Sequence, residues 1–296
     1  MNTPLFTGCA TALVTPFLPN GQLDEPALRR LLFMQLEAKI DALVLLGTTG
    51  EPCTLSMEER QRVIEIGLEC VGDSIPIIVG TGSNDTRRAI EYARQAQKLG
   101  AAGQLSVTPY YNKATQAGLV ASFTAVADAA DLPCVLYNVP GRTGCNIQPA
   151  TVAKLAEHPM ICAVKEASGN ISQVAQIAAL AGDKIDIYSG NDDQVVPIMA
   201  LGGKGVISVL SNVAPAATVE MCRRMLEGDV AGARELQLKY LPLIDALFCE
   251  VNPIPVKAAM AAMGYGENSL RLPLTCMEPA HEERLLGCMR ELGIIA

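Results

Sequence analysis

A lysine at the end of a short apolar segment is the residue of this chain best suited to covalent chemistry. Lys165 follows the apolar residues 161–164 and precedes the more polar residues 166–169, as it would at the end of a buried strand. Burial disfavours a charged ammonium group, so a lysine held there can act as a neutral amine, attack a carbonyl and form a Schiff base. The alternative is a lysine that extends from a strand end into solvent.

Hydroxyl groups at the ends of two other apolar segments favour the chemical interpretation. Tyr137 lies at the end of one such segment, and Thr48 and Thr49 lie in a Gly-Thr-Thr-Gly-Glu loop that follows another. If these segments are neighbouring strands of one parallel barrel, their carboxyl ends open on the same face. The phenol and the two hydroxyls would then converge on the amine of Lys165, where they could pass protons.

Strand-like and helix-like segments alternate along most of the chain. The predicted strands are residues 9–14, 42–46, 76–79, 104–108, 134–138, 161–165, 185–188 and 205–209. The predicted helices are residues 24–40, 56–71, 85–99, 116–129, 149–157, 171–181, 192–201 and 216–227. Continuous apolar strands that alternate with helices, with a period of about thirty residues, are typical of a parallel (β/α)8 barrel.

The sequence therefore predicts an α/β fold in two parts. The first is a (β/α)8 TIM barrel over residues 1–227, and the second is a C-terminal helical domain over residues 228–296. Its three helices are predicted at residues 229–248, 253–263 and 279–292. No low-complexity linker separates the parts, so the extension is expected to pack against the barrel.

Composition narrows the classes of function. Half of the 296 residues are hydrophobic and the formal net charge is −8, without blocks of like charge, which argues against a nucleic-acid partner. The ten cysteines include no Cys-x-x-Cys pair, and His158 and His281 are too few and too separated for a metal site. Residues 1–6 do not resemble a signal peptide and no apolar run is long enough to span a membrane, so we expect a cytoplasmic protein.

Six motifs carry a family resemblance. They are residues 47–51, 107–112, 137–144, 164–167, 189–192 and 205–209. In order and spacing they resemble the dihydrodipicolinate synthase (4-hydroxy-tetrahydrodipicolinate synthase) family of pyruvate-dependent Schiff-base aldolases, over essentially the whole chain. The resemblance implies a lyase of lysine and diaminopimelate biosynthesis that needs no cofactor and assembles as a homotetramer, a dimer of dimers.

The resemblance also implies which residues of this chain act on the first substrate. Lys165 would form the imine with pyruvate. Tyr137, Thr49 and Tyr111 would form a proton relay, with Tyr111 reaching in from a neighbouring subunit. Thr48 and Thr49 would hold the pyruvate carboxylate.

A second group of residues would complete the site. The backbones of Gly190 and Ile207 would line the pocket. Arg142 would bind the carboxylate of the second substrate, L-aspartate 4-semialdehyde, in a bidentate fork. Lys257 is not expected to be the nucleophile, because it lies in a predicted C-terminal helix without groups that handle carbonyls.

Two other functions stay open at this point. One is a related aldolase, such as N-acetylneuraminate lyase or a 2-keto-3-deoxy-sugar acid aldolase, although Arg142 and the paired threonines favour the synthase. The other is a catalytically silent binding barrel, which would be expected to have lost Lys165 or Tyr137. Because lysine-inhibited relatives place a glutamate at the position of Arg88 and often histidines at those of Met57 and Arg60, we also predict weak or no inhibition by L-lysine.

Overall fold

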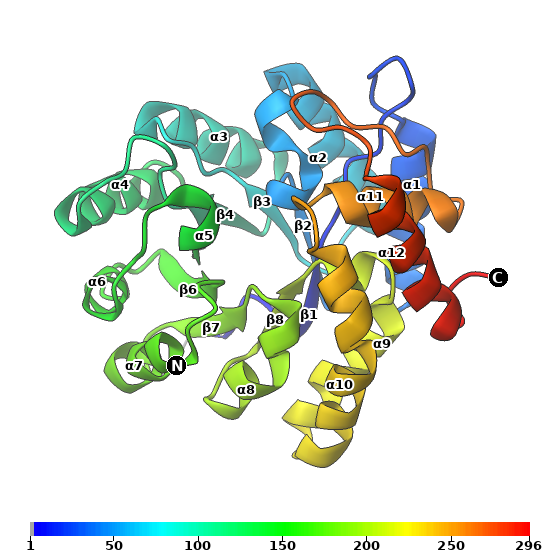
Figure 1. The fold of residues 1–296 in the computed structure, drawn as a ribbon. Coiled ribbons are helices and arrows are strands. Elements are labelled where there is room, and N and C mark those ends of the chain that lie inside the picture. Colours follow the sequence, from blue (N-terminus) through cyan, green and yellow to red (C-terminus); the bar gives the residue numbers. More distant parts are fainter. Residues whose placement is uncertain (1–2) are drawn as a thin grey trace.

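Eight parallel strands form a closed barrel in the computed structural model, which describes residues 3–296 (Figure 1). The strands are β1 Gly8–Ala12, β2 Ala42–Leu45, β3 Ile77–Gly80, β4 Gly103–Val107, β5 Cys134–Asn138, β6 Ile161–Glu166, β7 Asp186–Ser189 and β8 Gly205–Ser208. Each strand pairs with the next along the chain, and β8 pairs with β1. Residues 1 and 2, part of the segment assessed for a signal peptide, lie outside the described residues.

Helices surround the barrel (Figure 1). They are α1 Glu25–Glu37, α2 Met57–Val71, α3 Thr86–Leu99, α4 Gln116–Asp128, α6 Pro149–Leu155, α7 Ile171–Ala181, α8 Val195–Ala200 and α9 Pro215–Leu226. The predicted (β/α)8 barrel is confirmed, with most boundaries shifted by one to three residues. The predicted capping box of α2 is also present, since Ser56 Oγ accepts from Glu59 N at 3.2 Å and Glu59 Oε2 accepts from Ser56 N at 2.9 Å.

Short helical turns in the loops escaped the sequence-based prediction. They are η1 Thr48–Gly50, η2 Pro52–Thr54, α5 Pro140–Thr143, η3 Asp192–Gln194 and η4 Leu210–Asn212. Segments of three or four residues are too short to show a helical period. The η3 turn explains why α8 begins at Val195 and not at residue 192 as predicted.

Large side chains fill the interior of the barrel. Phe6, which precedes β1, stacks on Tyr188 of β7 with ring centroids 4.2 Å apart, and the Tyr188 hydroxyl donates to Phe6 O at 2.6 Å. Small and branched residues such as Ala10, Val44 and Ile207 pack around them. The interior of the barrel is therefore a packed core.

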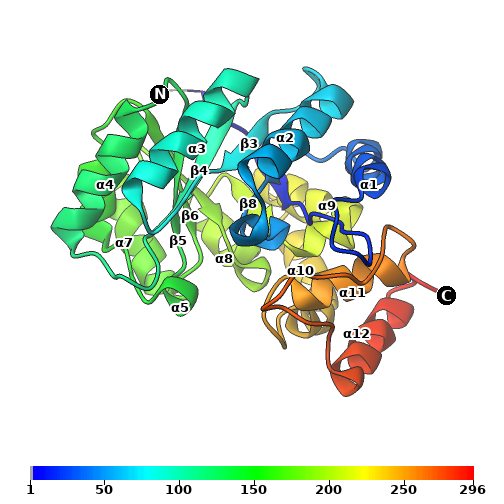
Figure 2. The same cartoon turned by 90° about the horizontal axis from the view of Figure 1, so that it is seen from above.

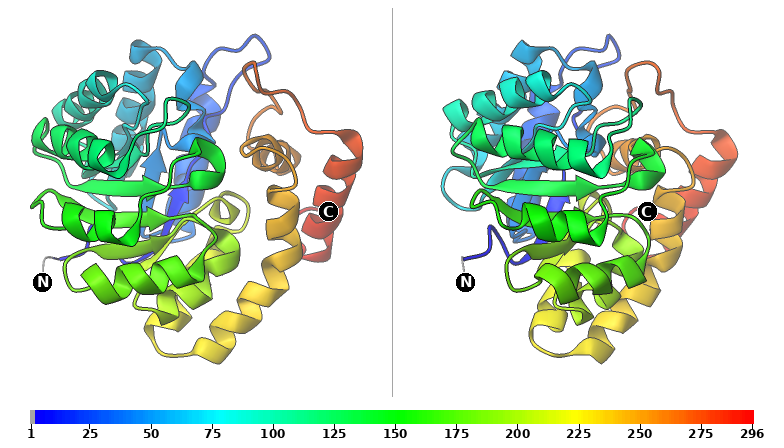
Figure 3. Two further views of the ribbon diagram at one scale, coloured as in Figure 1. Left: turned by 60° about the vertical axis from the view of Figure 1, so that its left-hand side comes forward. Right: turned by 90° about the vertical axis from the view of Figure 1, so that its left-hand side faces the viewer.

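Three more helices follow the barrel, as predicted. They are α10 Val230–Leu247, α11 Ile254–Ala262 and α12 Pro279–Glu291, and Figures 2 and 3 show them together on one side of the molecule. One hydrophobic cluster contains Leu31 of α1, Met221 of α9, Leu247 of α10, Val256 of α11 and Leu285 of α12. Barrel and extension thus share a core, while their division at residue 227 stays a prediction. None of the helices within residues 3–296 is both long and apolar enough to cross a membrane.

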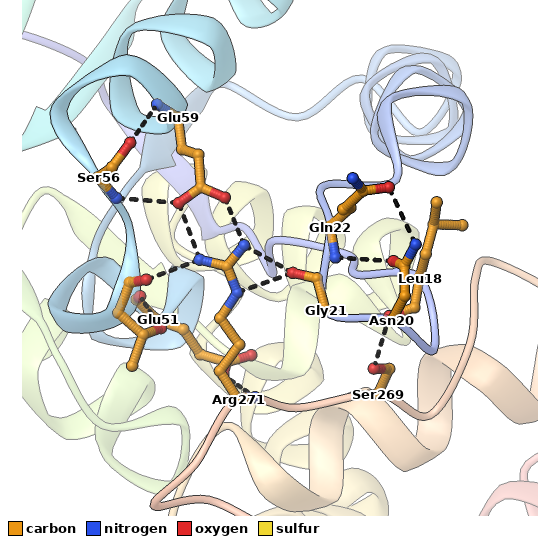
Figure 4. A network of polar contacts seen from close by, with 10 residues as sticks. Leu18, Asn20, Gly21, Gln22, Glu51, Ser56, Glu59, Ser269 and Arg271 are labelled. Carbon is orange, nitrogen blue, oxygen red and sulfur yellow. Dashed lines mark hydrogen bonds and ion pairs between the residues drawn. The ribbon is translucent and has the colours of Figure 1, made fainter.

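Polar contacts also tie the extension to the loop after β2 (Figure 4). Arg271, between α11 and α12, pairs with Glu59 of α2 and donates to Gly21 O at 2.6 Å. Deeper in the molecule, Lys257 of α11 forms an ion pair with Glu51 at 2.6 Å, with both side chains 2% exposed. Burial lowers the pKa of Lys257, and the Glu51 carboxylate opposes that shift.

Removing one member of this buried pair should strongly destabilise the fold. We expect Lys257→Met to lower the free energy of unfolding by about 3–5 kcal/mol, because it leaves the Glu51 carboxylate buried without its cation. Urea unfolding followed by circular dichroism measures this. The matched control is Lys184→Met, which removes the lysine of an exposed pair with Glu157 and should leave the free energy of unfolding nearly unchanged. Similar losses in the two variants would contradict the prediction.

Candidate active site

Two adjacent strands position the amine and the phenol. Tyr137 of β5 and Lys165 of β6 are partners in the register of the sheet, and both are buried. The Lys165 Nζ lies 4.4 Å from the centroid of the Tyr137 ring. Since side chains alternate along a strand, the next residues face the opposite way, and there Asn138 Nδ2 donates to Glu166 Oε2 at 3.0 Å.

The environment of Lys165 favours its neutral form. Burial lowers the pKa of Lys165 to about 8. The nearby Asp192 acts to raise this pKa, and the Arg142 cation makes a smaller contribution that lowers it. Burial also raises the pKa of Tyr137, while Arg142 and a hydrogen bond from Thr48 act in the opposite direction. The site therefore combines an amine that loses its proton easily with a phenol that keeps its own, as attack on a carbonyl and proton donation require.

The turn η1 presents two hydroxyls that go to different partners. The Thr48 hydroxyl meets the phenol of Tyr137, whereas Thr49 Oγ1 accepts from Asn252 Nδ2 at 3.0 Å. The family resemblance implies a place for Thr49 beside Tyr137 in the relay, and the hydrogen bond that lowers the pKa of Tyr137 comes from Thr48, so the relay role of Thr49 stays a prediction. In a 3₁₀ turn successive side chains point about 120° apart, so neighbouring hydroxyls do not reach one group.

The predicted residues meet at a cavity of about 460 Å³. Its lining includes Thr48, Thr49, Tyr137, Arg142, Lys165 and Gly190. At Gly190 an added Cβ would lie 3.0 Å from Lys165 Cε, so glycine leaves room for the lysine. A second cavity of about 330 Å³ shares Thr48, Tyr137 and Arg142 with the first.

Two predicted residues do not line this cavity. Ile207 is fully buried in β8, inside the barrel, and Val209 beyond the end of the strand takes its place in the lining. Tyr111 is 90% exposed and lines neither cavity. Its backbone φ is +72°, a strained value for a residue with a side chain, so its loop holds an unusual conformation.

The C-terminal extension contributes residues to the cavity that were not predicted from the sequence. Phe248, Glu250, Val251 and Asn252, between α10 and α11, line the cavity. No local signal marks these residues, because they reach the site only through the packing of the extension. Lys257 does not line this cavity, and its amine is bound to Glu51. Within residues 3–296, no three His, Cys, Asp or Glu side chains are grouped so that they could hold a metal ion.

Comparison with known proteins decides between the aldolase families. Residues 5–291 match the model of the dihydrodipicolinate synthetase family. The chain belongs to this family. The predicted family resemblance is thereby confirmed.

Curated relatives match almost the whole chain. The 4-hydroxy-tetrahydrodipicolinate synthase of Alkaliphilus oremlandii is 53% identical over 98% of this chain and 100% of its own. That of Caldicellulosiruptor saccharolyticus is 50% identical over 98% of each.

Solved structures of the family share the fold. Dihydrodipicolinate synthase of Thermotoga maritima aligns with a TM-score of 0.96 and 44% identity, over 98% of this chain and 100% of that one. The chloride-inhibited enzyme of Acinetobacter baumannii, complexed with pyruvate, aligns with a TM-score of 0.96 and 42% identity, over 98% and 99%. A monomeric dihydrodipicolinate synthase variant aligns with a TM-score of 0.96 and 44% identity, over 98% of each chain.

Proposed function

We propose that this protein is a 4-hydroxy-tetrahydrodipicolinate synthase that condenses pyruvate with L-aspartate 4-semialdehyde through an imine on Lys165. The observation that carries the proposal is the buried Lys165, in register with Tyr137 and beside Arg142 in one cavity. Curated synthases about half identical over nearly the whole chain support the same activity. This role belongs to lysine and diaminopimelate biosynthesis.

The geometry supports a stepwise mechanism on Lys165. Its neutral amine adds to the C2 carbonyl of pyruvate, and the Tyr137 hydroxyl donates a proton as the carbinolamine forms and water leaves. Loss of a proton from C3 converts the iminium to an enamine, whose C3 attacks the aldehyde carbon of the second substrate. The amine of that substrate then displaces Lys165, which closes the ring and restores the free amine.

The remaining residues hold the two substrates. Thr48 and Thr49, with the backbone of Gly190, lie where they could contact the pyruvate carboxylate. Arg142 carries a guanidinium at the cavity, and its fork suits the carboxylate of aspartate semialdehyde. An acidic protein with two anionic substrates needs such local positive charge.

A two-substrate assay tests the proposed activity. The purified protein is offered pyruvate with aspartate semialdehyde, or pyruvate with N-acetylmannosamine, and pyruvate consumption is followed. We expect turnover with the semialdehyde alone, because Arg142 supplies a carboxylate site that a neutral sugar chain does not need. Turnover with N-acetylmannosamine only would replace the proposal by a sugar-acid aldolase.

The pKa of Lys165 sets the pH dependence of the first step. With a pKa of about 8, roughly a tenth of the lysine is neutral at pH 7, against less than one part in a thousand at the ordinary value. We expect the rate of imine formation at low pyruvate concentration to rise about tenfold per pH unit and to level off above pH 8. Rapid quenching with borohydride measures this rate, and a midpoint near 10.5, the ordinary lysine value, would disprove the prediction.

A relay through a second subunit is also part of the proposal. Tyr111 is 90% exposed and lies outside the cavity that Tyr137 lines. An exposed tyrosine held by a strained backbone is available for contact with a neighbouring copy. We therefore keep the homotetramer, a dimer of dimers, as the proposed assembly.

Mixed oligomers can test whether Tyr111 acts across subunits. Tyr111→Phe and Lys165→Ala chains should each be nearly inactive alone. After co-refolding, hybrids should recover activity, since one site at each mixed interface regains both groups. The control is a co-refolded mixture of Tyr111→Phe with Tyr111→Phe/Lys165→Ala chains, which should stay inactive. If hybrids verified by mass spectrometry recovered no activity, Tyr111 would not act in the site of a neighbouring subunit.

Regulation and location complete the proposal. Arg88 is exposed and pairs with Glu91 at 3.2 Å, whereas Arg60 is buried, with its guanidinium 3.8 Å from the Tyr92 ring centroid. Of these two arginines, Arg88 is thus the accessible one, and weak or absent inhibition by L-lysine stays a prediction.

The cytoplasmic location also stays a proposal. The ten cysteines are free thiols, as is typical of a reducing compartment.

A further inference from the structure

Asn252 joins the C-terminal extension to the candidate active site. It lies between α10 and α11, and 203 residues separate it from its hydrogen-bond partner Thr49. The residue is 6% exposed, and it lines both cavities. Neither the sequence motifs nor the mechanism above assigns it a role.

The side chain of Asn252 controls how Thr49 uses its hydroxyl. Asn252 Nδ2 donates to Thr49 Oγ1 at 3.0 Å, so the threonine oxygen is an acceptor in this contact. A hydroxyl has one proton to donate, and this contact leaves that proton for a group in the cavity. Thr49 is therefore set to donate a hydrogen bond where the carboxylate of the first substrate is proposed to bind.

The main chain of Asn252 restrains a group for the second substrate. Arg142 Nη2 donates to Asn252 O at 2.8 Å. Arg142 is otherwise exposed, and a free arginine side chain has many rotamers. Its hydrogen bond to a backbone carbonyl holds one edge of the guanidinium and leaves other N–H groups for a carboxylate.

Asn252 is itself firmly held. The next residue, Pro253, accepts from Lys257 N at 3.0 Å, and Lys257 Nζ binds Glu51 at 2.6 Å. Because Glu51 directly follows the turn η1, one segment of the extension fixes that turn at Thr49 and at Glu51. Asn252 Oδ1 is buried and has no hydrogen-bond partner among residues 3–296, so the contact with Thr49 is the side-chain hydrogen bond of this amide.

We propose that Asn252 is a positioning residue of this active site, which orients the Thr49 hydroxyl toward the first substrate and restrains Arg142 for the second. The inference rests on the proposed function, since it assigns Thr49 to the pyruvate carboxylate. It predicts that the KM for pyruvate depends more on the ability of the Asn252 side chain to donate a hydrogen bond than on the shape of that side chain. Asparagine and aspartate have the same shape, but a carboxylate accepts hydrogen bonds and does not donate them.

Two substitutions separate donor character from packing. In Asn252→Ala the donor is lost, and we expect the KM for pyruvate to rise roughly tenfold. In Asn252→Asp the carboxylate would accept the hydrogen bond that the Thr49 hydroxyl can donate, and it would repel the pyruvate carboxylate. The KM for pyruvate should therefore rise roughly a hundredfold. The kcat at saturating pyruvate should change less than about threefold in either variant, provided that Lys165 and Tyr137 are undisturbed.

Asn268→Asp is the matched control. Asn268 also belongs to the extension and also has a buried, unpaired Oδ1, but it lines neither cavity. We expect this control to keep the KM of the unmodified protein, even if its thermal unfolding midpoint falls. A merely structural role for Asn252 would lower the unfolding midpoint and the active fraction without changing KM.

Two results would overturn the inference. One is a pyruvate KM within twofold of the unmodified protein in both Asn252 variants, and the other is an equal rise of KM in Asn268→Asp. Trapping with borohydride at saturating pyruvate distinguishes a failure of this inference from a failure of the proposed function. One adduct per chain in the unmodified protein and in each variant supports the inference, whereas no adduct in the unmodified protein refutes the proposed function itself.

Discussion

Lys165→Met is expected to lower kcat/KM by about 10⁴-fold or more, because thioether sulfur cannot form an imine. The substitution keeps an unbranched side chain in the buried space between Tyr137 and Gly190. The fold should therefore persist, and the loss of activity can be assigned to the missing amine. Steady-state kinetics with pyruvate and aspartate semialdehyde, together with circular dichroism, measure the two properties.

Borohydride trapping identifies the nucleophile directly. With pyruvate and borohydride, the unmodified protein should gain one reduced adduct per chain, and peptide mass spectrometry should place it on Lys165. Lys165→Met should gain none. The control Lys204→Met, which removes a partly exposed lysine next to β8, should gain the same adduct as the unmodified protein. An adduct found instead on Lys204 or Lys257 would refute the assignment.

Tyr137→Phe is expected to lower kcat by about 10²–10⁴-fold, the range typical of a lost general acid or base. The ring, and hence its packing against Lys165, remains, while the hydroxyl that meets Thr48 is removed. Each proton transfer of imine formation then depends on water. Single-turnover formation of the borohydride-trapped imine should slow together with the overall reaction.

The matched control is Tyr188→Phe, which also removes a hydroxyl from a buried tyrosine of the barrel. The Tyr188 hydroxyl donates to Phe6 O at 2.6 Å and lines neither cavity. Its loss should cost about 1 kcal/mol of stability and leave kcat nearly unchanged. If both variants lost activity equally, the effect of Tyr137 would lie in packing and not in proton transfer.

The hydrophobic core that the C-terminal extension shares with the barrel holds the extension's contacts with the candidate site in place. Asn252 contacts Thr49, and Lys257 binds the residue that ends the same turn. A loosely attached extension would let these contacts break, since isolated polar contacts contribute little unless packing holds them in place. The shared hydrophobic cluster supplies that packing.

Local patterns in the sequence are enough to predict the fold class and the pair Lys165 and Tyr137. Continuous apolar strands alternating with helices are local patterns, and they place Lys165 and Tyr137 at strand ends whatever the distant contacts are. Parallel pairing in chain order then brings the two side chains to one face, as their partnership in the register shows. The motifs around them identify the family for the same reason.

The surroundings of that pair depend on contacts between residues that are far apart in the chain. Which threonine meets Tyr137 depends on the 3₁₀ turn at Thr48–Gly50, and three residues carry no readable period. The contacts of Thr49 with Asn252 and of Glu51 with Lys257 join residues 203 and 206 positions apart. Local patterns predict which face of an element is buried, but only the packing of the whole chain determines which remote residue meets that face.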